Sequence, residues 1–167
     1  MNRAGDLLER IVAGWAILGG IVLLLIVAVT GTNVGLYVVD AIVPGAVRVI
    51  SGYEDIVRLF VSAAALMMLP YCQLRRGHVT VDLLTEGLSP RVVRRLDLAS
   101  LGLMTALPLF LGYWMIFGML ETRADGRISP VLEWAQWPFY LPGLVSLALW
   151  ALVALDQLRR AWRESPA

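Results

Sequence analysis

The sequence has few of the residues that carry out chemistry in soluble enzymes. Its 167 residues contain one cysteine, Cys72, one histidine, His78, and no lysine. A single cysteine excludes an intrachain disulfide and a Cys-x-x-Cys redox site. Zinc sites need three or four protein ligands, so we predict no metal site and no cofactor. We also predict no hydrolase activity, because the one histidine falls in a predicted loop, away from any nucleophile that it could activate.

Charged residues are scarce as well. They make up 16% of the chain, against 59% hydrophobic residues, whereas about a quarter of the residues in a soluble domain are charged. The net charge is only +1, and the arginines are dispersed along the chain, which excludes a basic face for nucleic acid. This composition predicts an integral membrane protein.

Long apolar segments are what the chain has instead. Each is long enough to cross a hydrocarbon core of about 30 Å as a helix. We therefore predict an all-α integral membrane protein with four transmembrane helices in one domain, residues 1–167, with spans at about 11–30, 53–74, 98–120 and 137–155. The first apolar segment exceeds the 7 to 15 or so residues of a signal peptide, and we expect it to be retained as a span.

Arginine is unevenly divided between the two sides of the predicted bundle. Ten arginines flank the spans on the side of the termini and the middle loop, and four lie on the other side. Because cytoplasmic loops retain positive residues, both termini are predicted to be cytoplasmic. The candidates for setting topology and for contacting anionic headgroups are Arg75, Arg76, Arg94 and Arg95. Aromatic residues cluster at the predicted outer boundary, as amphipathic rings prefer, and these are Tyr53, Tyr113, Trp114, Trp134, Trp137 and Tyr140.

Two connecting segments have features of their own. Residues 37–50 are largely apolar, which favours a helix lying in the membrane interface between the first and second spans. The alternative is an extension of the first span that breaks at Pro44. In the middle loop, Ser89 followed by Pro90 resembles a helix N-cap with proline at the first position. The third span is therefore expected to begin there as a cytoplasmic helix.

Three charged residues open the second span. Glu54 and Arg58 are spaced to pair on one helix face, which would lower the energetic cost of bringing both toward lipid. Two roles remain for this pair, a structural staple or a contact with a partner subunit. Asp55 points to another face of the same turn, where its charge is favoured by the positive end of the helix dipole.

The middle loop holds the remaining candidate residues, Gly77, His78 and Asp82. His78 and Asp82 are spaced to share one helical face, but two ligands are too few for a metal site. We expect a loop or capping role for them, or a contact with a partner.

The centres of the predicted spans contain no acid or base. Ionisable residues deep in a bilayer mark ion and proton pathways, so their absence argues against a transporter that works alone. Small residues, including Ala16, Gly20 and residues 62–65, permit close helix contact, either inside this bundle or with a partner.

The order of these features resembles the small membrane subunit of tripartite ATP-independent periplasmic (TRAP) transporters, a four-span family often named after the dicarboxylate system. The matching pieces are the acidic pair opening the second span, the middle-loop motifs and the residues ahead of the fourth span: Glu54-Asp55, Gly77-His78-Val79, Val81-Asp82-Leu83-Leu84 and Ile128-Ser129-Pro130. One departure is Leu36 before Tyr37, where the family commonly has arginine, so no role of that arginine is transferred.

The resemblance implies a bacterial inner-membrane subunit without catalytic activity. Its partners would be a large permease subunit, which carries the substrate and sodium sites, and a soluble periplasmic protein that delivers a small organic acid. In that role the chain would be a scaffold for the large subunit. The alternatives are a small stand-alone exporter that acts as a dimer and, least favoured, a membrane enzyme. The sequence does not identify the solute.

Overall fold

The protein forms four long helices, and their arrangement is described from a computed structural model. The structure describes residues 3–48, 50–75 and 89–163. The helices are α1 (Arg3–Ile42), α2 (Tyr53–Leu74), α3 (Pro90–Ala124) and α4 (Tyr140–Arg163), with a short 3-10 turn, η2 (Trp137–Phe139), ahead of α4. All four are long and apolar enough to cross a membrane. The predicted all-α fold with four spans is confirmed.

Three of the helices are longer than the predicted spans. α1 has 40 residues and α3 has 35, so at 1.5 Å per residue they are about 60 and 52 Å long, well beyond a hydrocarbon core of about 30 Å. α3 begins at Pro90, as expected, and the carbonyl of Ser89 accepts hydrogen bonds from the backbone of Val92 and Val93. α2 spans the predicted residues.

The segment predicted as an interfacial helix takes the alternative form. Residues 37–42 continue α1, and no separate helix occurs among the described residues between Ile42 and Tyr53. α1 ends at Ile42, and Gly45, with a φ of 81°, then turns the chain and donates its backbone N–H to the Asp40 carboxylate. The backbone N–H of Ile50 then donates to the Asn33 side chain at 2.9 Å, which folds the linker back against α1. This polar anchoring outweighs the apolar composition that favoured an interfacial helix.

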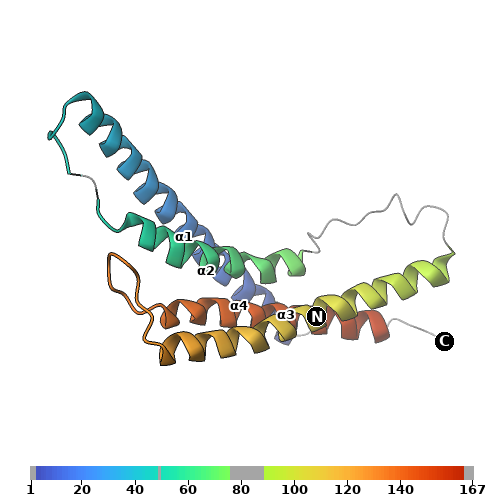
Figure 1. Ribbon diagram of the computed structural model, residues 1–167. Coiled ribbons are helices and arrows are strands. Elements are labelled where there is room, and N and C mark those ends of the chain that lie inside the picture. Colours follow the sequence, from blue (N-terminus) through green and yellow to red (C-terminus); the bar gives the residue numbers. More distant parts are fainter. Residues whose placement is uncertain (1–2, 49, 76–88, 164–167) are drawn as a thin grey trace.

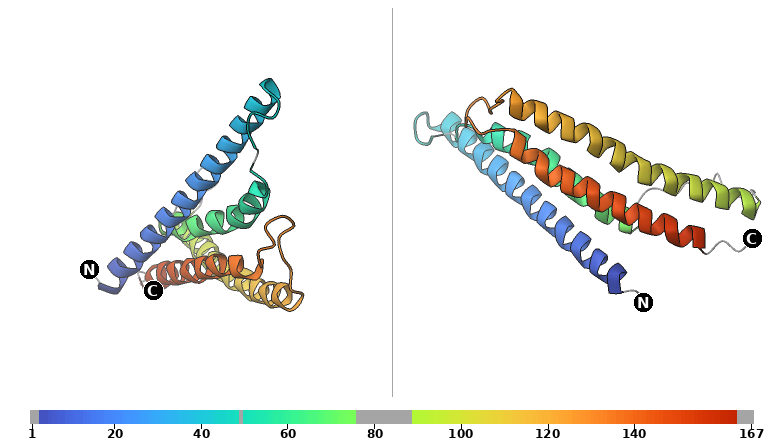
Figure 2. Two further views of the ribbon diagram at one scale, coloured as in Figure 1. Left: turned by 90° about the vertical axis from the view of Figure 1, so that its left-hand side faces the viewer. Right: turned by 90° about the horizontal axis from the view of Figure 1, so that it is seen from below.

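α2 and α4 form the centre of the bundle, and α1 and α3 lie outside them. α2 packs against α1 and α4, and α4 packs against α3 (Figure 1). α1 runs obliquely to the other three helices, and its C-terminal part stands away from them (Figure 2). The most apolar windows of α2 and α4 are 28% and 33% buried, against 11% for α1 and for α3. The outer helices therefore present most of their apolar surface to their surroundings.

Small residues bring the helices close inside the bundle. A Cβ added at Gly19 would lie 2.8 Å from Met67 Cβ and 3.2 Å from the Ala64 carbonyl oxygen, so α1 and α2 touch there. A Cβ at Gly143 would clash with Met115 at the contact of α4 with α3. Such close approach supplies the packing that replaces the hydrophobic effect in lipid. Within residues 62–65, Ala63 and Ala64 are buried, while the other two are exposed.

Candidate functional site

The first turn of α2 is tied to the loop between α3 and α4. Asp55 is 4% exposed, and its Oδ2 accepts the backbone N–H groups of Val131 at 2.8 Å and Leu132 at 2.9 Å. Hydrogen bonds to an ionised acceptor are among the strong ones in proteins. A carboxylate beside the first turn of a helix is also favoured by the helix dipole. Asp55 therefore connects two parts of the chain that are more than 70 residues apart.

The loop that Asp55 contacts has a defined internal structure. Ser129 is 2% exposed, its backbone N–H donates to the Trp134 carbonyl, and its Oγ accepts the Trp134 N–H at 3.1 Å. An isolated bridge pairs Ile128 with Ala135. Glu133 has a φ of 54°, a left-handed conformation that is uncommon outside glycine. These contacts hold residues 127–136 in one shape.

Gly52 completes this contact from the side of α2. Its φ is 83°, and an added Cβ would lie 2.9 Å from Leu132 Cγ and Cδ2 and 3.3 Å from Val131 Cγ1. Glycine is required here for both its backbone conformation and the space that it leaves. We call this contact the Asp55 junction, and it consists of Gly52, Asp55, Ser129, Val131 and Leu132.

Glu54 and Arg58, predicted to be able to pair, are both exposed and do not form an ion pair. Glu54 instead lies within 3.5 Å of the Tyr53 hydroxyl. The ion pairs among the described residues are Arg127 with Glu121 and Asp125, and Arg160 with Asp156. Exposure leaves Glu54 and Arg58 available for a partner, and that role stays a prediction.

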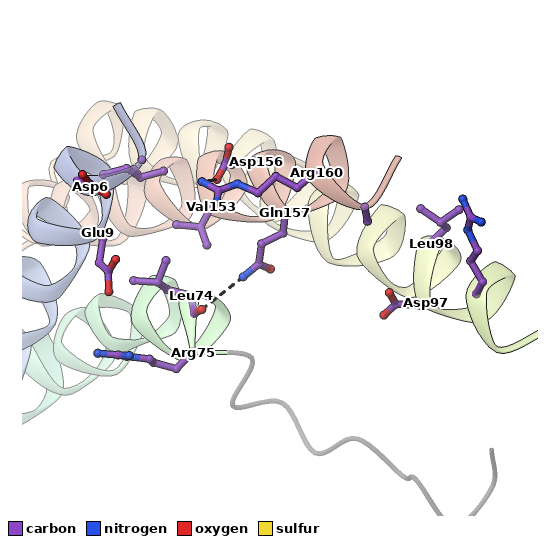
Figure 3. Close-up of a pocket in the computed structure, with 14 residues that line it drawn as sticks. Asp6, Glu9, Leu74, Arg75, Asp97, Leu98, Val153, Asp156, Gln157 and Arg160 are labelled. Atoms are coloured by element: carbon purple, nitrogen blue, oxygen red, sulfur yellow. Dashed lines mark hydrogen bonds and ion pairs between the residues drawn. The ribbon is translucent and has the colours of Figure 1, made fainter. Parts of the chain in front are cut away.

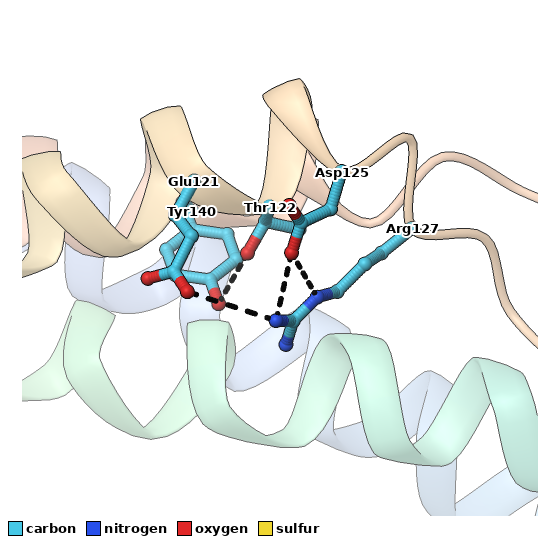
Figure 4. A network of polar contacts seen from close by, with 5 residues as sticks. All are labelled: Glu121, Thr122, Asp125, Arg127 and Tyr140. Atoms are coloured by element: carbon cyan, nitrogen blue, oxygen red, sulfur yellow. Dashed lines mark hydrogen bonds and ion pairs between the residues drawn. The ribbon is translucent and has the colours of Figure 1, made fainter.

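A second polar group lies beside the Asp55 junction, where α3 ends and α4 begins (Figure 4). Thr122 Oγ1 donates to the Tyr140 hydroxyl at 3.2 Å. Arg127 donates to Asp125 Oδ2 from Nε at 3.0 Å and from Nη2 at 2.9 Å, and these bonds raise the pKa of the Arg127 guanidinium above its usual value. Together with the Asp55 junction, these contacts define the loop end of the bundle, formed by residues 43–48, 50–52 and 125–136.

The opposite end, near the chain termini, has a polar cluster of neutral side chains. Gln73, which is 3% exposed, donates from Nε2 to Gln157 Oε1 at 2.7 Å and accepts from Trp150 Nε1 at 3.1 Å. Gln157 Nε2 donates in turn to the Gln73 carbonyl at 2.9 Å. We call these three residues the Gln73 cluster. It joins the last turn of α2 to α4, and no motif in the sequence indicated it.

A cavity of about 990 Å³ lies at this terminal end, lined by residues from all four helices (Figure 3). Arg75 and Arg94, two of the predicted headgroup-contacting residues, line it together with Asp6, Glu9 and Asp97. Arg75 Nε donates to the Tyr71 hydroxyl at 3.1 Å, which raises the pKa of Arg75. Because acids and arginines are mixed on its wall, the cavity does not select one sign of ligand charge.

The remaining candidates lie elsewhere. Arg95 is exposed on α3 and does not line the cavity. Arg76, Gly77, His78 and Asp82 fall outside the described residues, and so does most of the middle loop. In the described part of the chain, no group of three or more histidine, cysteine or acidic residues is placed to hold a metal ion.

Comparison with known families decides the identity. Residues 26–164 match the model of the DctQ component of the tripartite ATP-independent periplasmic transporters. The chain belongs to the DctQ family. No curated protein and no solved structure matched.

Membership makes this chain the small permease component of a TRAP transporter, a multi-pass protein of the inner membrane. The match covers α2, α3 and α4 in full, and it includes the whole Asp55 junction. Asp55 and Ser129, one residue from each of two motifs on which the resemblance was based, meet in that junction. Sequence reasoning named both motifs without placing them together, because no pattern within either one indicates its partner.

Proposed function

We propose that this DctQ component is a non-catalytic scaffold for the large permease subunit of a sodium-coupled transporter, to which a periplasmic binding protein delivers small organic acids. The observation that carries the proposal is that the buried polar side chains bond to other structural elements of the chain. The Asp55 carboxylate accepts two backbone N–H groups of the loop, and Gln73 bonds to α4. These groups join structural elements to one another, whereas an ion pathway needs ionisable groups facing a route across the bilayer.

The placement of these contacts also supports a scaffold. The Asp55 junction connects the first turn of α2 to the α3–α4 loop. The Gln73 cluster connects the last turn of α2 to α4. A bundle pinned at both ends of its central helix resists relative sliding of the helices. Such resistance is what a stationary subunit needs beside a partner whose transport domain moves.

The test compares the chain alone with the assembled transporter in proteoliposomes. We expect no solute flux with the chain alone, and sodium-dependent uptake when the large permease and the binding protein are both present. Uptake by the chain alone that falls on neutralising Glu54 or Asp55 would instead favour the stand-alone dimeric exporter. Uptake without a sodium gradient would overturn the coupling but leave the scaffold role.

The proposed orientation places both termini in the cytoplasm, as the arginine distribution suggests. In that orientation the loop end of the bundle is periplasmic, on the side of the binding protein. Reporter fusions test this directly. A fusion after Ala167 should read cytoplasmic and a fusion in the loop near Asp125 should read periplasmic, and reversed signals would contradict the orientation.

A further inference from the structure

The cavity at the terminal end lies where the uncharged stretches of the helices stop. Three charged residues on its wall directly adjoin the uncharged stretches of α2, α3 and α4: Arg75, Asp97 and Asp156. Three apolar residues on the same wall belong to those stretches: Leu74, Leu98 and Val153. Charged residues flank membrane spans where hydrocarbon gives way to headgroups. The cavity therefore lies at headgroup depth, whichever side of the membrane this end faces.

The cavity has the size of a small-molecule site. Its volume of about 990 Å³ is near the top of the range of about 300–1,000 Å³ that ligand pockets have. Asp6 and Glu9 lie on its α1 side, and Asp97 and Leu98 lie on its α3 side (Figure 3). A phospholipid headgroup with its glycerol therefore has room between the helices.

Four charged side chains of the wall have an oppositely charged neighbour. Arg160 pairs with Asp156 at 2.6 Å. Glu9 is close enough to Arg75 for its charge to contribute to the raised pKa of that guanidinium, to which the hydrogen bond with Tyr71 contributes most. These charges are balanced within the chain, so they do not call for a ligand.

Arg94 and Asp97, both on α3, have no such neighbour. Arg94 Nη2 is buried and has no hydrogen-bond partner. Within residues 3–48, 50–75 and 89–163, neither side chain forms a hydrogen bond or an ion pair. A buried charged donor without an acceptor is costly. The two residues are spaced i, i+3, which places their Cβ atoms about 5–6 Å apart. The cavity wall therefore offers a donor for an anion and, beside it, an acceptor for a cation.

We infer that this cavity binds the headgroup of a zwitterionic phospholipid, in which Arg94 donates to the phosphate and Asp97 accepts from the ammonium. Guanidinium matches the geometry of phosphate oxygens, and pockets between membrane helices hold lipid headgroups through such residues. An ethanolamine headgroup fits best, since a short ethylene link joins its ammonium to the phosphate and the ammonium can donate N–H groups to Asp97.

Other phospholipid headgroups fit the wall less well. Phosphatidylglycerol has no cation, so it would leave Asp97 unpaired and would be repelled by Asp6 and Glu9. Phosphatidylcholine has the same two charges as phosphatidylethanolamine, but its quaternary ammonium has no N–H to donate. The inference goes beyond the proposed scaffold function and does not depend on it.

Lipid retention measures the selectivity. The full-length chain is placed in nanodiscs with equal parts of phosphatidylethanolamine, phosphatidylglycerol and phosphatidylcholine, and native mass spectrometry then identifies the lipids that stay bound. We expect about tenfold more phosphatidylethanolamine than phosphatidylglycerol, and about threefold more than phosphatidylcholine. Equal retention of the three lipids, or a preference for phosphatidylglycerol, would overturn the inference.

Neighbouring arginines of α3 provide a matched pair of variants. Arg94→Gln removes the phosphate ligand and should lower phosphatidylethanolamine retention about tenfold. Arg95→Gln makes the same change of charge at an exposed side chain that does not line the cavity, and retention should be unchanged. Equal retention by both variants, whether lowered or not, would contradict a specific role of Arg94.

Asp97→Asn tests the cation half of the site and does not depend on how well the Arg94 variant folds. It should lower the ratio of phosphatidylethanolamine to phosphatidylglycerol about tenfold while lipid is still retained through Arg94. A merely structural role of Asp97 would change the amount of bound lipid and leave this ratio as it is. An unchanged ratio would therefore overturn the inference.

A competitor distinguishes a lipid from a soluble ligand with the same chemistry. Phosphoethanolamine, the free headgroup, is added in large excess to the nanodiscs. We expect it to leave the retained lipid in place, because it lacks the acyl chains that hold the lipid in the membrane. Displacement would assign the cavity to a soluble compound and overturn the lipid site. The scaffold function stands or fails separately, on solute uptake.

Discussion

The two ends of α2 are fastened by different chemistry. At the loop end, the Asp55 carboxylate accepts two backbone N–H groups from a loop. At the terminal end, the Gln73 carboxamide both donates to Gln157 and accepts from Trp150. A carboxylate only accepts, which suits consecutive backbone donors, whereas a carboxamide matches mixed partners without placing a charge among the helices. A helix end can therefore be fastened with or without a charge, according to the groups available across the contact.

The charged Asp55 junction should be the more sensitive of the two ends to substitution. Asp55→Ala removes the acceptor of both loop N–H groups and should loosen residues 127–136. We expect trypsin to cleave after Arg127 about tenfold faster, because local opening exposes the backbone. Limited proteolysis in detergent, with fragment analysis, measures this. Asp55→Asn keeps an acceptor oxygen and should have a smaller effect, and equal rates for the Asp55→Ala variant and the parent would contradict the role of the junction.

The steric part of the junction is tested at Gly52. Gly52→Ala imposes a side chain on a φ of 83° and drives its Cβ against Leu132. Gly45→Ala is the matched control, because Gly45 has a φ of 81° with nothing within 4 Å of an added Cβ. We expect the Gly52 variant to lose about 1–2 kcal/mol more unfolding free energy than the control. Equilibrium unfolding in detergent measures the difference. Equal losses would show that the Leu132 side chain moves aside without a loss of unfolding free energy.

The neutral end should respond less. Gln73→Ala and Gln157→Ala, alone and combined, form a double-mutant cycle across the contact of α2 with α4. We expect a coupling of about 0.6–1.7 kcal/mol, as for hydrogen bonds between membrane helices. Unfolding free energies of the four proteins give this value. A coupling near zero would show that Gln73 and Gln157 contribute to stability independently of each other.

The smallest effect is expected beside the Asp55 junction. Arg127→Gln removes the ion pairs of an exposed guanidinium, whose side chain is 55% accessible. Exposed ion pairs contribute little to stability, so the unfolding midpoint should stay within about 1 °C. Thermal unfolding followed by tryptophan fluorescence checks this. A large shift would mean that the loop end depends on a wider charge network than Asp55 alone.

Much of the fold could be predicted because membrane spans depend on local composition. The predicted bounds of the second span agree with α2, and Ser89-Pro90 marked the start of α3 correctly. The prediction at residues 37–50 was less successful, since apolar content alone did not reveal that Asn33 and Asp40 anchor the turn after α1. Hydropathy measures affinity for lipid and carries no information about such pairings.

The site was only partly predictable for a related reason. Asp55 was a candidate because an acid at the entry of an apolar helix is conspicuous. Its partners, the backbone N–H groups of Val131 and Leu132, have no signature, because every residue except proline carries that group. Gln73 and Gln157 were visible as polar residues near the ends of spans, but many residues there simply face headgroups.

The membrane location, the four apolar spans and the family motifs could all be read from the sequence, since they follow from the cost of burying polar groups in lipid and from local residue order. The packing of the helices is what brings Asp55 to the Ser129 loop and Gln73 to α4. Those facts depend on which helix packs beside which, and helices that are all apolar look alike until they are packed.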